Sequence, residues 1–414
     1  MKTDIHTDIV VAGGGAAGIA AAIAAARQSL NVLLIERNAY PGGKATAAEV
    51  GTVCGLYKFN KKNNAQYLVK GFAKEFAEHL QKKSGTKPLF NADGLHYLPY
   101  NIEDFKSVSL EYLHKNKVTV YFDTEIKSVQ THQQKINTVT VIKNGQQLNI
   151  NFQSIIDCTG AGIIGQAAHL PTIESYTYQA AAQVFSITGI EETNEARLGL
   201  IITKAVSAAI ANKILPAFYD RVYIVPGSLK NNGASFKVGI PIAVTNTPEN
   251  LQELKKAAHS FVSNLTTFLI ANVDVFKNAS IKNIASEVGT RTGQRNVGKY
   301  ILTEEDVLAC RKFDDGIALA AWPIEEWGQD RRVNMRYLPQ DDYYHVPAAC
   351  LQSAGIGNLF FAGRNISATD AAIASARVMG ICLQTGYAAG CLAAAVVKNI
   401  SMADAVVQIQ TSQL

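Results

Sequence analysis

The sequence predicts an α/β fold in which a three-layer ββα domain is joined to a second, mixed α+β domain. Near the N-terminus, a β-branched run leads into a glycine-rich turn and then an alanine-rich stretch, which predicts a strand, a turn and a helix. In the middle, the alternating apolar patterns of Ala180–Ile187, Val222–Val225 and Ser235–Ile242 predict antiparallel strands. A chain of 414 residues is long enough for two or three domains.

The composition predicts a soluble globular protein with a large core, since 48% of residues are hydrophobic and 18% are charged. A net charge of +5 suits an acidic ligand but is too small to predict nucleic-acid binding. The 6 cysteines form no CxxC pair and no zinc spacing, so we expect reduced thiols, a cytoplasmic location and no metal. Glycines interrupt the apolar stretch Ile9–Ala26, which favours a buried strand and helix over a membrane span or signal peptide.

The opening unit has the order strand, glycine turn, helix, strand. Asp8–Ala12 is the first expected strand, Ala16–Arg27 the helix and Asn31–Ile35 the second strand, which ends at Glu36. Between the first strand and the helix, three glycines have the spacing GxGxxG, at Gly13, Gly15 and Gly18. Together this order predicts a dinucleotide site of the Rossmann type.

Each part of this unit has a physical task. Gly13 permits the tight turn, Gly15 lets the backbone approach a pyrophosphate, and Gly18 allows close contact between helix and strand. The N-terminus of the helix, which opens with Ala16 and Ala17, offers free N–H groups and a partial positive charge to phosphates. The carboxylate of Glu36 is placed to accept hydrogen bonds from ribose hydroxyls.

Three later segments resemble the opening unit, because each contains a turn or the end of a strand that is rich in small residues. The first is Pro41–Ala47, with a second double glycine. The second is Ile155–Gly162, which follows an expected β-meander (Lys117–Phe152) with a hairpin turn at Asn144-Gly145. The third is Asn358–Asn365, followed by an expected helix over Ala371–Ala395. A nicotinamide dehydrogenase with a single nucleotide-binding unit has no need of the last two segments.

With these segments in view, the chain resembles the FAD-dependent oxidoreductase family with a glutathione-reductase-type FAD-binding domain. The resemblance rests on GGKATAAEVGTVCG (42–55), VGTRTGQRNVGKYILTEEDV (288–307) and AGRNISATDAAIASARVMGICLQTGYAAG (362–390). Residues 170–280 resemble no family that we can name. The resemblance implies a discontinuous FAD-binding domain of residues 1–80, 115–170 and 340–414. A substrate domain of residues 171–339 is then expected, with or without 85–112.

The resemblance also implies a set of FAD-binding residues, with FAD held non-covalently. They are Gly13, Gly15, Ala16, Ala17, Gly18, Glu36, Arg37, Gly42, Gly43, Lys44, Thr46, Ile126, Thr159, Gly160, Gly363, Arg364, Asn365 and Ala371. Many family members carry an Asp where this chain has Arg364, so we expect backbone N–H groups and Asn365 to hold the ribityl chain. A helix opening near Thr369–Ile373 would direct its positive dipole end toward the flavin.

The candidates for catalysis come from the residues themselves. Arg291 and Arg295 are suited to a substrate carboxylate, with the alternative of ion pairs to Glu287 or Glu325 or a clamp between domains. His345 is a candidate proton carrier, with the alternative of a structural histidine.

Tyr343 and Tyr344, which precede His345, are weaker candidates for proton transfer. Two further features favour structural interpretations. Cys54 is expected to be buried and inert. Thr303 and Asp306 fit a helix-capping box, which makes the acidic residues there structural.

Three functions remain open at this point. The resemblance favours an FAD-dependent oxidoreductase that transfers a hydride between the flavin and an unidentified small-molecule or peptidyl substrate. A flavin monooxygenase or halogenase-like enzyme is the first alternative, although Trp322–Trp327 lacks the halogenase spacing WxWxIP. A non-catalytic flavoprotein with structural FAD is the second.

Overall fold

A parallel sheet built from both ends of the chain forms the centre of the computed structural model, which describes residues 4–62, 64–173, 175, 178–245 and 247–414. Its five strands have the order β22-β11-β2-β3-β7. They are β2 (Ile9–Ala12), β3 (Val32–Ile35), β7 (Thr119–Tyr121), β11 (Ser154–Asp157) and β22 (Leu359–Phe361). Ile156 in β11 lies opposite Val11 in β2 on one side and Phe360 in β22 on the other. The N-terminal and C-terminal segments therefore share one sheet.

A second sheet covers one face of the parallel sheet. It consists of β1 (Asp4–His6), β8 (Thr124–His132), β9 (Lys135–Lys143) and β10 (Gln146–Asn151) in the order β1-β10-β9-β8. The predicted hairpin turn at Asn144-Gly145 is confirmed, since β9 ends and β10 begins around it. The predicted meander began too early, because β7 pairs with β3 in the parallel sheet instead.

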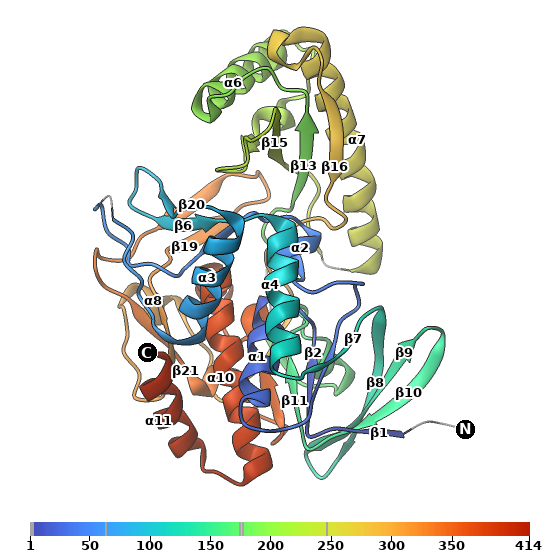
Figure 1. Cartoon of the computed structure of the whole chain (residues 1–414), viewed down its shortest axis with the longest axis vertical. Coiled ribbons are helices and arrows are strands. Elements are labelled where there is room, and N and C mark those ends of the chain that lie inside the picture. Colours follow the sequence, from blue (N-terminus) through green and yellow to red (C-terminus); the bar gives the residue numbers. More distant parts are fainter. Residues whose placement is uncertain (1–3, 63, 174, 176–177, 246) are drawn as a thin grey trace.

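Helices cover the other face of the parallel sheet (Figure 1). They are α1 (Ala16–Ala26), α3 (Gly71–Ser84), α4 (Ile102–Lys115) and α10 (Met379–Lys398), with α11 (Met402–Gln413) at the chain end. Alternate residues of β2 point to the two layers: Val11 packs into the core with the helices, and Val10 into the core with the second sheet. Parallel strands that are buried on both faces explain the uninterrupted apolar runs of the sequence.

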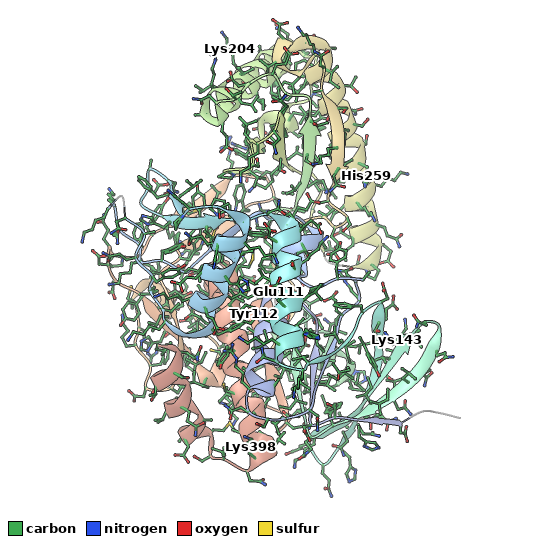
Figure 2. The ribbon with its side chains drawn as sticks, in the orientation of Figure 1. Glu111, Tyr112, Lys143, Lys204, His259 and Lys398 are labelled. Carbon is green, nitrogen blue, oxygen red and sulfur yellow. The ribbon has the colours of Figure 1, made fainter. Side chains whose placement is uncertain are left out.

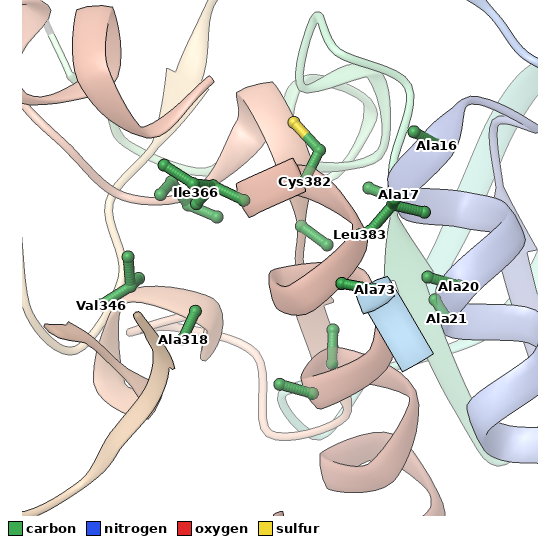
Figure 3. Close-up of a cluster of buried hydrophobic side chains, with 14 of the residues drawn as sticks. Ala16, Ala17, Ala20, Ala21, Ala73, Ala318, Val346, Ile366, Cys382 and Leu383 are labelled. Atoms are coloured by element: carbon green, nitrogen blue, oxygen red, sulfur yellow. The ribbon is translucent and has the colours of Figure 1, made fainter. Parts of the chain in front are cut away.

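The helices α1 and α10 lie in direct contact because small residues line both. A side chain at Gly386 would overlap the backbone of Ala17, and one at Gly390 would overlap the carbonyl group of Ala21. Figure 3 shows Ala17 of α1 facing Cys382 and Leu383 of α10. This close packing holds the N-terminal turn of α1 against the segment that follows β22.

A second unit extends from one end of the molecule (Figure 1). Its sheet has the order β14-β15-β13-β16, from β13 (Ala182–Thr188), β14 (Val222–Ile224), β15 (Gly233–Gly239) and β16 (Ser280–Ile284). The helices α6 (Glu195–Ala211) and α7 (Pro248–Asn272) pack on it around a separate core. The three predicted strands correspond to β13, β14 and β15, and their antiparallel pairing is confirmed. Lys204 and His259 lie on the outward faces of the two helices (Figure 2).

Smaller elements join the two units. They are α2 (Lys44–Ala47), β4 (Thr52–Cys54), β5 (Leu89–Phe90), β6 (His96–Pro99), α5 (Ile163–Ala167), β12 (Thr172–Ile173), β17 (Arg295–Asn296), α8 (Glu304–Leu308), β18 (Gly316–Ala320), β19 (Ile324–Trp327), β20 (Val333–Arg336), β21 (Tyr344–Pro347) and α9 (Asp370–Ala376). The predicted capping box of Thr303 and Asp306 is confirmed at the start of α8.

The packing bears on two of the expected domain bounds. Phe105 and Val108 of α4 pack into the large core with α1, which favours the alternative without residues 85–112 in the second unit. Leu302, Val307 and Ile317 also pack into the large core, although we expected residues up to 339 in the second unit. Their apolar faces are buried against the helical layer, which no local pattern indicates.

The expected helix over Ala371–Ala395 is two helices, α9 and α10, interrupted at Arg377 and Val378. The break lets α10 pass close to Gly55, where a side chain at Gly380 would meet the backbone of Gly55 at 2.7 Å. Within the described part of the chain, α10 alone is long and apolar enough to cross a membrane. Of its most apolar stretch, 83% is buried inside the protein, as in a core helix.

Candidate active site

The glycine turn between β2 and α1 opens at the carboxyl end of the parallel strands. Gly13 has φ +96°, and a side chain at Gly18 would overlap the carbonyl oxygen of Gly13, so both positions require glycine. Among the described residues, no side chain caps the N-terminus of α1. Its first backbone N–H groups therefore have no acceptor from a capping side chain, as in anion-binding helix termini.

Glu36 lies beside this turn with 5% of its surface exposed. Its Oε2 accepts a hydrogen bond from the backbone N–H of Gly14 at 2.6 Å, and its Oε1 accepts one from Asn38 at 2.9 Å. Burial raises the pKa of Glu36, and these backbone bonds oppose the shift. Each carboxylate oxygen retains a lone pair for a further donor such as a ribose hydroxyl.

The strand that carries Ile126 begins next to Glu36. The backbone N–H of Thr124, at the start of β8, donates to the carbonyl oxygen of Glu36 at 3.1 Å. Ile126 follows two residues later and is partly buried in the core between the sheets. The structure therefore brings this predicted residue to the same edge as Glu36.

The double glycine after β3 lies directly against the first glycine turn. The backbone N–H of Gly42 donates to the carbonyl oxygen of Gly14 at 2.8 Å. Thr46 is 3% exposed, and its hydroxyl donates to the carbonyl oxygen of Pro41 at 2.8 Å. Thr46, predicted as an FAD-binding residue, thus stabilises the turn from within through its hydroxyl.

Two predicted cationic residues of this region share one carboxylate. Glu287 lies 2.6 Å from Arg37 and 2.7 Å from the ammonium group of Lys44. Lys44 also donates to the carbonyl oxygen of Val288 at 2.7 Å. Burial lowers the pKa of Lys44 to about 8, and Glu287 opposes the shift. Glu287 was expected to pair with Arg291 or Arg295, and it instead holds the two cations of the first segments.

A buried carboxylate that the sequence analysis did not single out joins the ends of β11 and β22. Asp157 is fully buried and accepts hydrogen bonds from the backbone N–H of Thr159 at 3.0 Å, its hydroxyl at 2.7 Å and the N–H of Ile164 at 2.9 Å. The side-chain amide of Asn365 also donates to it. In the sequence, Asp157 could have been noticed as an acidic residue at the end of an apolar strand.

The expectation that Asn365 holds the ribityl chain is wrong. Its amide nitrogen donates to Asp157, its amide oxygen accepts from the backbone N–H of Gly162 at 3.2 Å, and the residue is fully buried. Both ends of the amide therefore serve to fix the two strand ends together.

Arg364 and Gly160 meet where these two segments converge. A side chain at Gly160 would overlap the guanidinium group of Arg364, which donates to the carbonyl oxygen of Thr290 at 3.0 Å. Arg364 has no carboxylate within 4.0 Å in the described part of the chain. Burial lowers its pKa. It is a half-buried cation without a paired anion, which fits a site for a negatively charged cofactor.

The C-terminal segment also contacts the first helix. A side chain at Gly363 would lie 2.8 Å from the Cβ atom of Ala17, so the two backbones approach closely. Ala371 lies in the first turn of α9, which has only 7 residues. Thr369 caps this helix by accepting from Ala372, and Asp370 lies in the first turn. The expected dipole of this helix is thus satisfied by its own residues.

The two arginines proposed for substrate have different environments. Arg295 is fully buried, and its nitrogens donate to the carbonyl oxygens of Ala368 at 2.9 Å and Gly293 at 3.1 Å and to the carboxylate of Asp370. This is the clamp alternative, and a substrate contact for Arg295 is wrong. Arg291 donates to the carbonyl oxygen of Ala180 and lies over the ring of Trp327, 4.3 Å from its centroid.

The contacts of His345 favour the alternative of a structural histidine over its predicted proton transfer. Its ring Nδ1 contacts the backbone N–H and carbonyl oxygen of Phe313, each at 3.1 Å, and its ring stacks on Tyr343. Tyr344 precedes His345 in β21 and is fully buried, and its hydroxyl lies 2.7 Å from the hydroxyl of Ser375. Because side chains alternate along a strand, His345 faces the opposite direction.

A polar cluster that the sequence analysis did not assemble surrounds the two tryptophans. Glu325 accepts from the indole N–H of Trp322 at 3.0 Å and of Trp327 at 2.7 Å, and it lies 4.0 Å from Arg377. Burial acts to raise the pKa of Glu325, but Arg377 and the indoles lower it overall. Cys54 lies near this cluster and is half-buried, whereas we expected it to be fully buried. Removal of its thiol from water raises the pKa of Cys54 to about 12.

A cavity of about 450 Å³ opens beside Trp327. It is lined by residues of the β19–β20 hairpin together with Tyr178, Gln179, Thr292 and Asp370. Gln179 accepts from Arg377 at 3.1 Å, so the cavity adjoins the polar cluster. In the described part of the chain, no group of three or more His, Cys, Asp or Glu side chains could hold a metal ion.

The sequence model of a known family, described as FAD dependent oxidoreductase, matches residues 8–413. The chain belongs to the FAD-dependent oxidoreductase family. This FAD-dependent oxidoreductase is therefore a flavin enzyme, and the uncapped helix, buried Glu36 and unpaired Arg364 fit FAD. No curated protein matches the sequence.

Solved structures similar to this oxidoreductase are distant in sequence and show the fold alone. Anhydrotetracycline hydroxylase OxyS from Streptomyces rimosus matches with a TM-score of 0.53 and 10% identity, over 98% of this chain and 65% of that one. A geranylgeranyl bacteriochlorophyll reductase-like protein from Thermoplasma acidophilum matches with a TM-score of 0.48 and 13% identity, over 99% of this chain and 83% of that one.

Proposed function

We propose that this oxidoreductase binds FAD non-covalently in a Rossmann-type domain of the glutathione-reductase kind and exchanges a hydride between the flavin and an organic substrate. The cofactor domain would comprise the parallel sheet with its two covering layers. The unit of β13–β16, α6 and α7 would be the substrate domain. The proposal covers both oxidation and reduction of the organic substrate.

One observation carries the proposal: segments from both ends of the chain converge at the carboxyl edge of a single parallel sheet. The turn at Gly13–Gly18 follows β2, Thr159 and Gly160 follow β11, and Gly363 and Arg364 follow β22. Ligands of open α/β sheets bind outside this edge. A cofactor as long as FAD needs several such segments, whereas one glycine turn suffices for a mononucleotide.

The residues of this edge have separate tasks in the proposal. The N-terminus of α1 would hold the pyrophosphate through its uncapped N–H groups. Glu36 would accept bonds from the adenosine ribose, and Arg364 would supply positive charge near the junction of β11 and β22. When bound, FAD supplies the two-electron hydride chemistry.

The cavity beside Trp327 is the proposed entry for substrate. It opens between the β19–β20 hairpin, the segment that leads into β13 and the first turn of α9. Its volume of about 450 Å³ suits a small molecule or the end of a peptide.

The alternative is a flavin monooxygenase or halogenase-like enzyme, and the structurally similar OxyS is a hydroxylase. The two functions differ in their reductant. An oxidoreductase of organic substrates exchanges electrons directly with its substrate, whereas a monooxygenase needs NAD(P)H or a separate reductase and then oxygen.

The purified holoprotein tests these functions. Bound flavin should absorb at roughly 370 and 450 nm, and an anaerobic panel of organic donors should bleach the 450 nm band. Bleaching by NAD(P)H alone would favour the monooxygenase. Bleaching only by dithionite would favour a structural flavin, and protein without flavin after refolding with excess FAD would refute the whole proposal.

A further inference from the structure

A small pocket next to Trp327 is surrounded by cationic side chains. It is lined by Ala180, Ala181, Ala182, Arg221, Tyr223, Lys237, Gly239, Arg291, Trp327 and Arg331. These residues come from the sheet of the second unit, from the segment after β16 and from the β19–β20 hairpin. Four of them carry a positive charge, and no carboxylate lines the pocket.

The charges of this pocket are only partly balanced by neighbouring acids. Asp220 lies 3.4 Å from Arg221 and 3.3 Å from Arg331, so these two arginines share one carboxylate. In contrast, Arg291 and Lys237 have no carboxylate within 4.0 Å in the described ranges. Both cations lie over the ring of Trp327, the Arg291 guanidinium at 4.3 Å and the Lys237 ammonium at 5.3 Å from the ring centroid.

The nearest acid to these two cations is already engaged. Glu325 holds both indoles and faces Arg377 at 4.0 Å. Burial lowers the pKa of Arg291 to about 9, Arg377 adding to the shift and Glu325 opposing it. Burial also lowers the pKa of Lys237 to about 8, and Arg291 adds to the shift by repulsion. A cluster of half-buried cations that repel each other is stabilised by a bound anion.

The size of the pocket limits which anion can enter. Its free volume of about 10 Å³ is near that needed for one water molecule. A flat carboxylate can place one oxygen there and match the planar fork of Arg291. A tetrahedral phosphate brings two further oxygens to the same narrow space, so a planar carboxylate matches it better.

We propose that Arg291 and Lys237 bind the carboxylate of the substrate, so that this enzyme acts on an organic acid. The remainder of the substrate would pass Trp327, which lines both the small pocket and the cavity of about 450 Å³. That the bound carboxylate belongs to the substrate rests on the function proposed above, whereas binding of a carboxylate at this site does not depend on turnover.

Acetate and its neutral analogue acetamide test the site in the FAD-loaded protein. Binding is measured by calorimetric titration at constant ionic strength, with chloride as the balancing anion. Acetate should bind to the wild-type protein, and acetamide at least about tenfold more weakly. Arg291→Met and Lys237→Met should each weaken acetate binding by about tenfold or more without changing the flavin content.

Matched variants separate charge, geometry and folding. Arg291→Lys keeps the charge without the fork and should restore part of the affinity. Arg197→Met, a change of a 75% exposed arginine on α6, should leave acetate binding unchanged. If Arg291→Met does not fold, Lys237→Met decides alone, since this lysine forms no ion pair among the described residues.

Three results would overturn the carboxylate site: equal binding of acetate and acetamide, undiminished acetate binding by both methionine variants, or tighter Arg291-dependent binding of phosphate than of acetate. The proposed function fails separately, through absent flavin or absent bleaching. A protein that binds acetate through Arg291 but is not reduced by organic donors would keep the site and lose the function.

Discussion

Glu287 offers a sharp test of how the cofactor segments are held, because it is the carboxylate shared by Arg37 and Lys44. Its side chain is 18% exposed and also accepts from the amide of Asn38 at 3.3 Å. Burial acts to raise the pKa of Glu287, but Lys44 and Arg37 outweigh it and bring the pKa to about 2. The perturbation is Glu287→Gln, which keeps the shape and removes the charge.

The magnitude follows from the two opposed shifts. The fall of the Glu287 pKa from 4.5 to about 2 corresponds to about 3 kcal/mol in favour of the folded state. The fall of the Lys44 pKa from 10.5 to about 8 corresponds to a cost of similar size at neutral pH. The intact pair therefore contributes little net stability. Removal of Glu287 alone leaves the cost on Lys44, so we expect a loss of about 2–3 kcal/mol.

Calorimetric melting measures this loss. For a chain of 414 residues, 1 kcal/mol corresponds to about 1 °C in Tm, so Glu287→Gln should lower Tm by about 2–3 °C. The double variant Lys44→Met/Glu287→Gln should lose less, because the unpaired cation is removed too. Glu253→Gln, an exposed change on α7, is the control.

The pH dependence has a defined sign. Because folding lowers the pKa of Glu287, its stabilisation is present above about pH 4.5 and is lost as the pH falls toward 2. The difference in Tm between the wild type and Glu287→Gln should thus be largest above pH 4.5, while Lys44 remains protonated, and should close below pH 4.5. Equal Tm values for the two proteins at pH 7, or a double variant that loses more than the single one, would refute the reasoning.

The remaining predictions concern residues that the structure assigns to different tasks. Gly18→Val, whose side chain would overlap the carbonyl of Gly13, should reduce FAD affinity by about tenfold or more, measured as the ratio of flavin to protein absorbance after dialysis. Arg295→Met leaves Asp370 partly buried without its partner and should cost about 3 kcal/mol, seen as a lower Tm, with unchanged acetate binding per folded molecule. His345→Gln should leave the anaerobic rate of flavin reduction within about twofold of wild type, because the His345 ring contacts Phe313 and Tyr343 rather than the converging segments; a loss of about a hundredfold would return it to the site.

The local features of the fold were predictable from the sequence. The glycine turn, the helix it opens, the hairpin at Asn144-Gly145 and the capping box at Thr303 all formed where the pattern indicated. Each depends on backbone geometry or hydrogen bonds within a few residues. The break at Arg377 was missed because the contact that accompanies it, between α10 and Gly55, involves a distant part of the chain.

The site residues divide in the same way. Glu36, Gly160 and Arg364 lie where their segments led us to expect, at one edge of the sheet. Asn365 and Thr46 lie there too, but their polar atoms are used inside the protein. A motif gives the position of a side chain along a strand, whereas its free hydrogen-bonding atoms depend on neighbours from other segments.

By itself, the sequence determined a flavin-type nucleotide site assembled from both ends of the chain, since glycine spacing and apolar strands act through local geometry. Only the tertiary structure decided that Arg295 is a clamp and that Arg291 joins Lys237 at Trp327. Arg291 is 54 positions from Lys237 and 36 positions from Trp327 in sequence. Coulombic interactions depend on distance in space and on burial, which no linear spacing records.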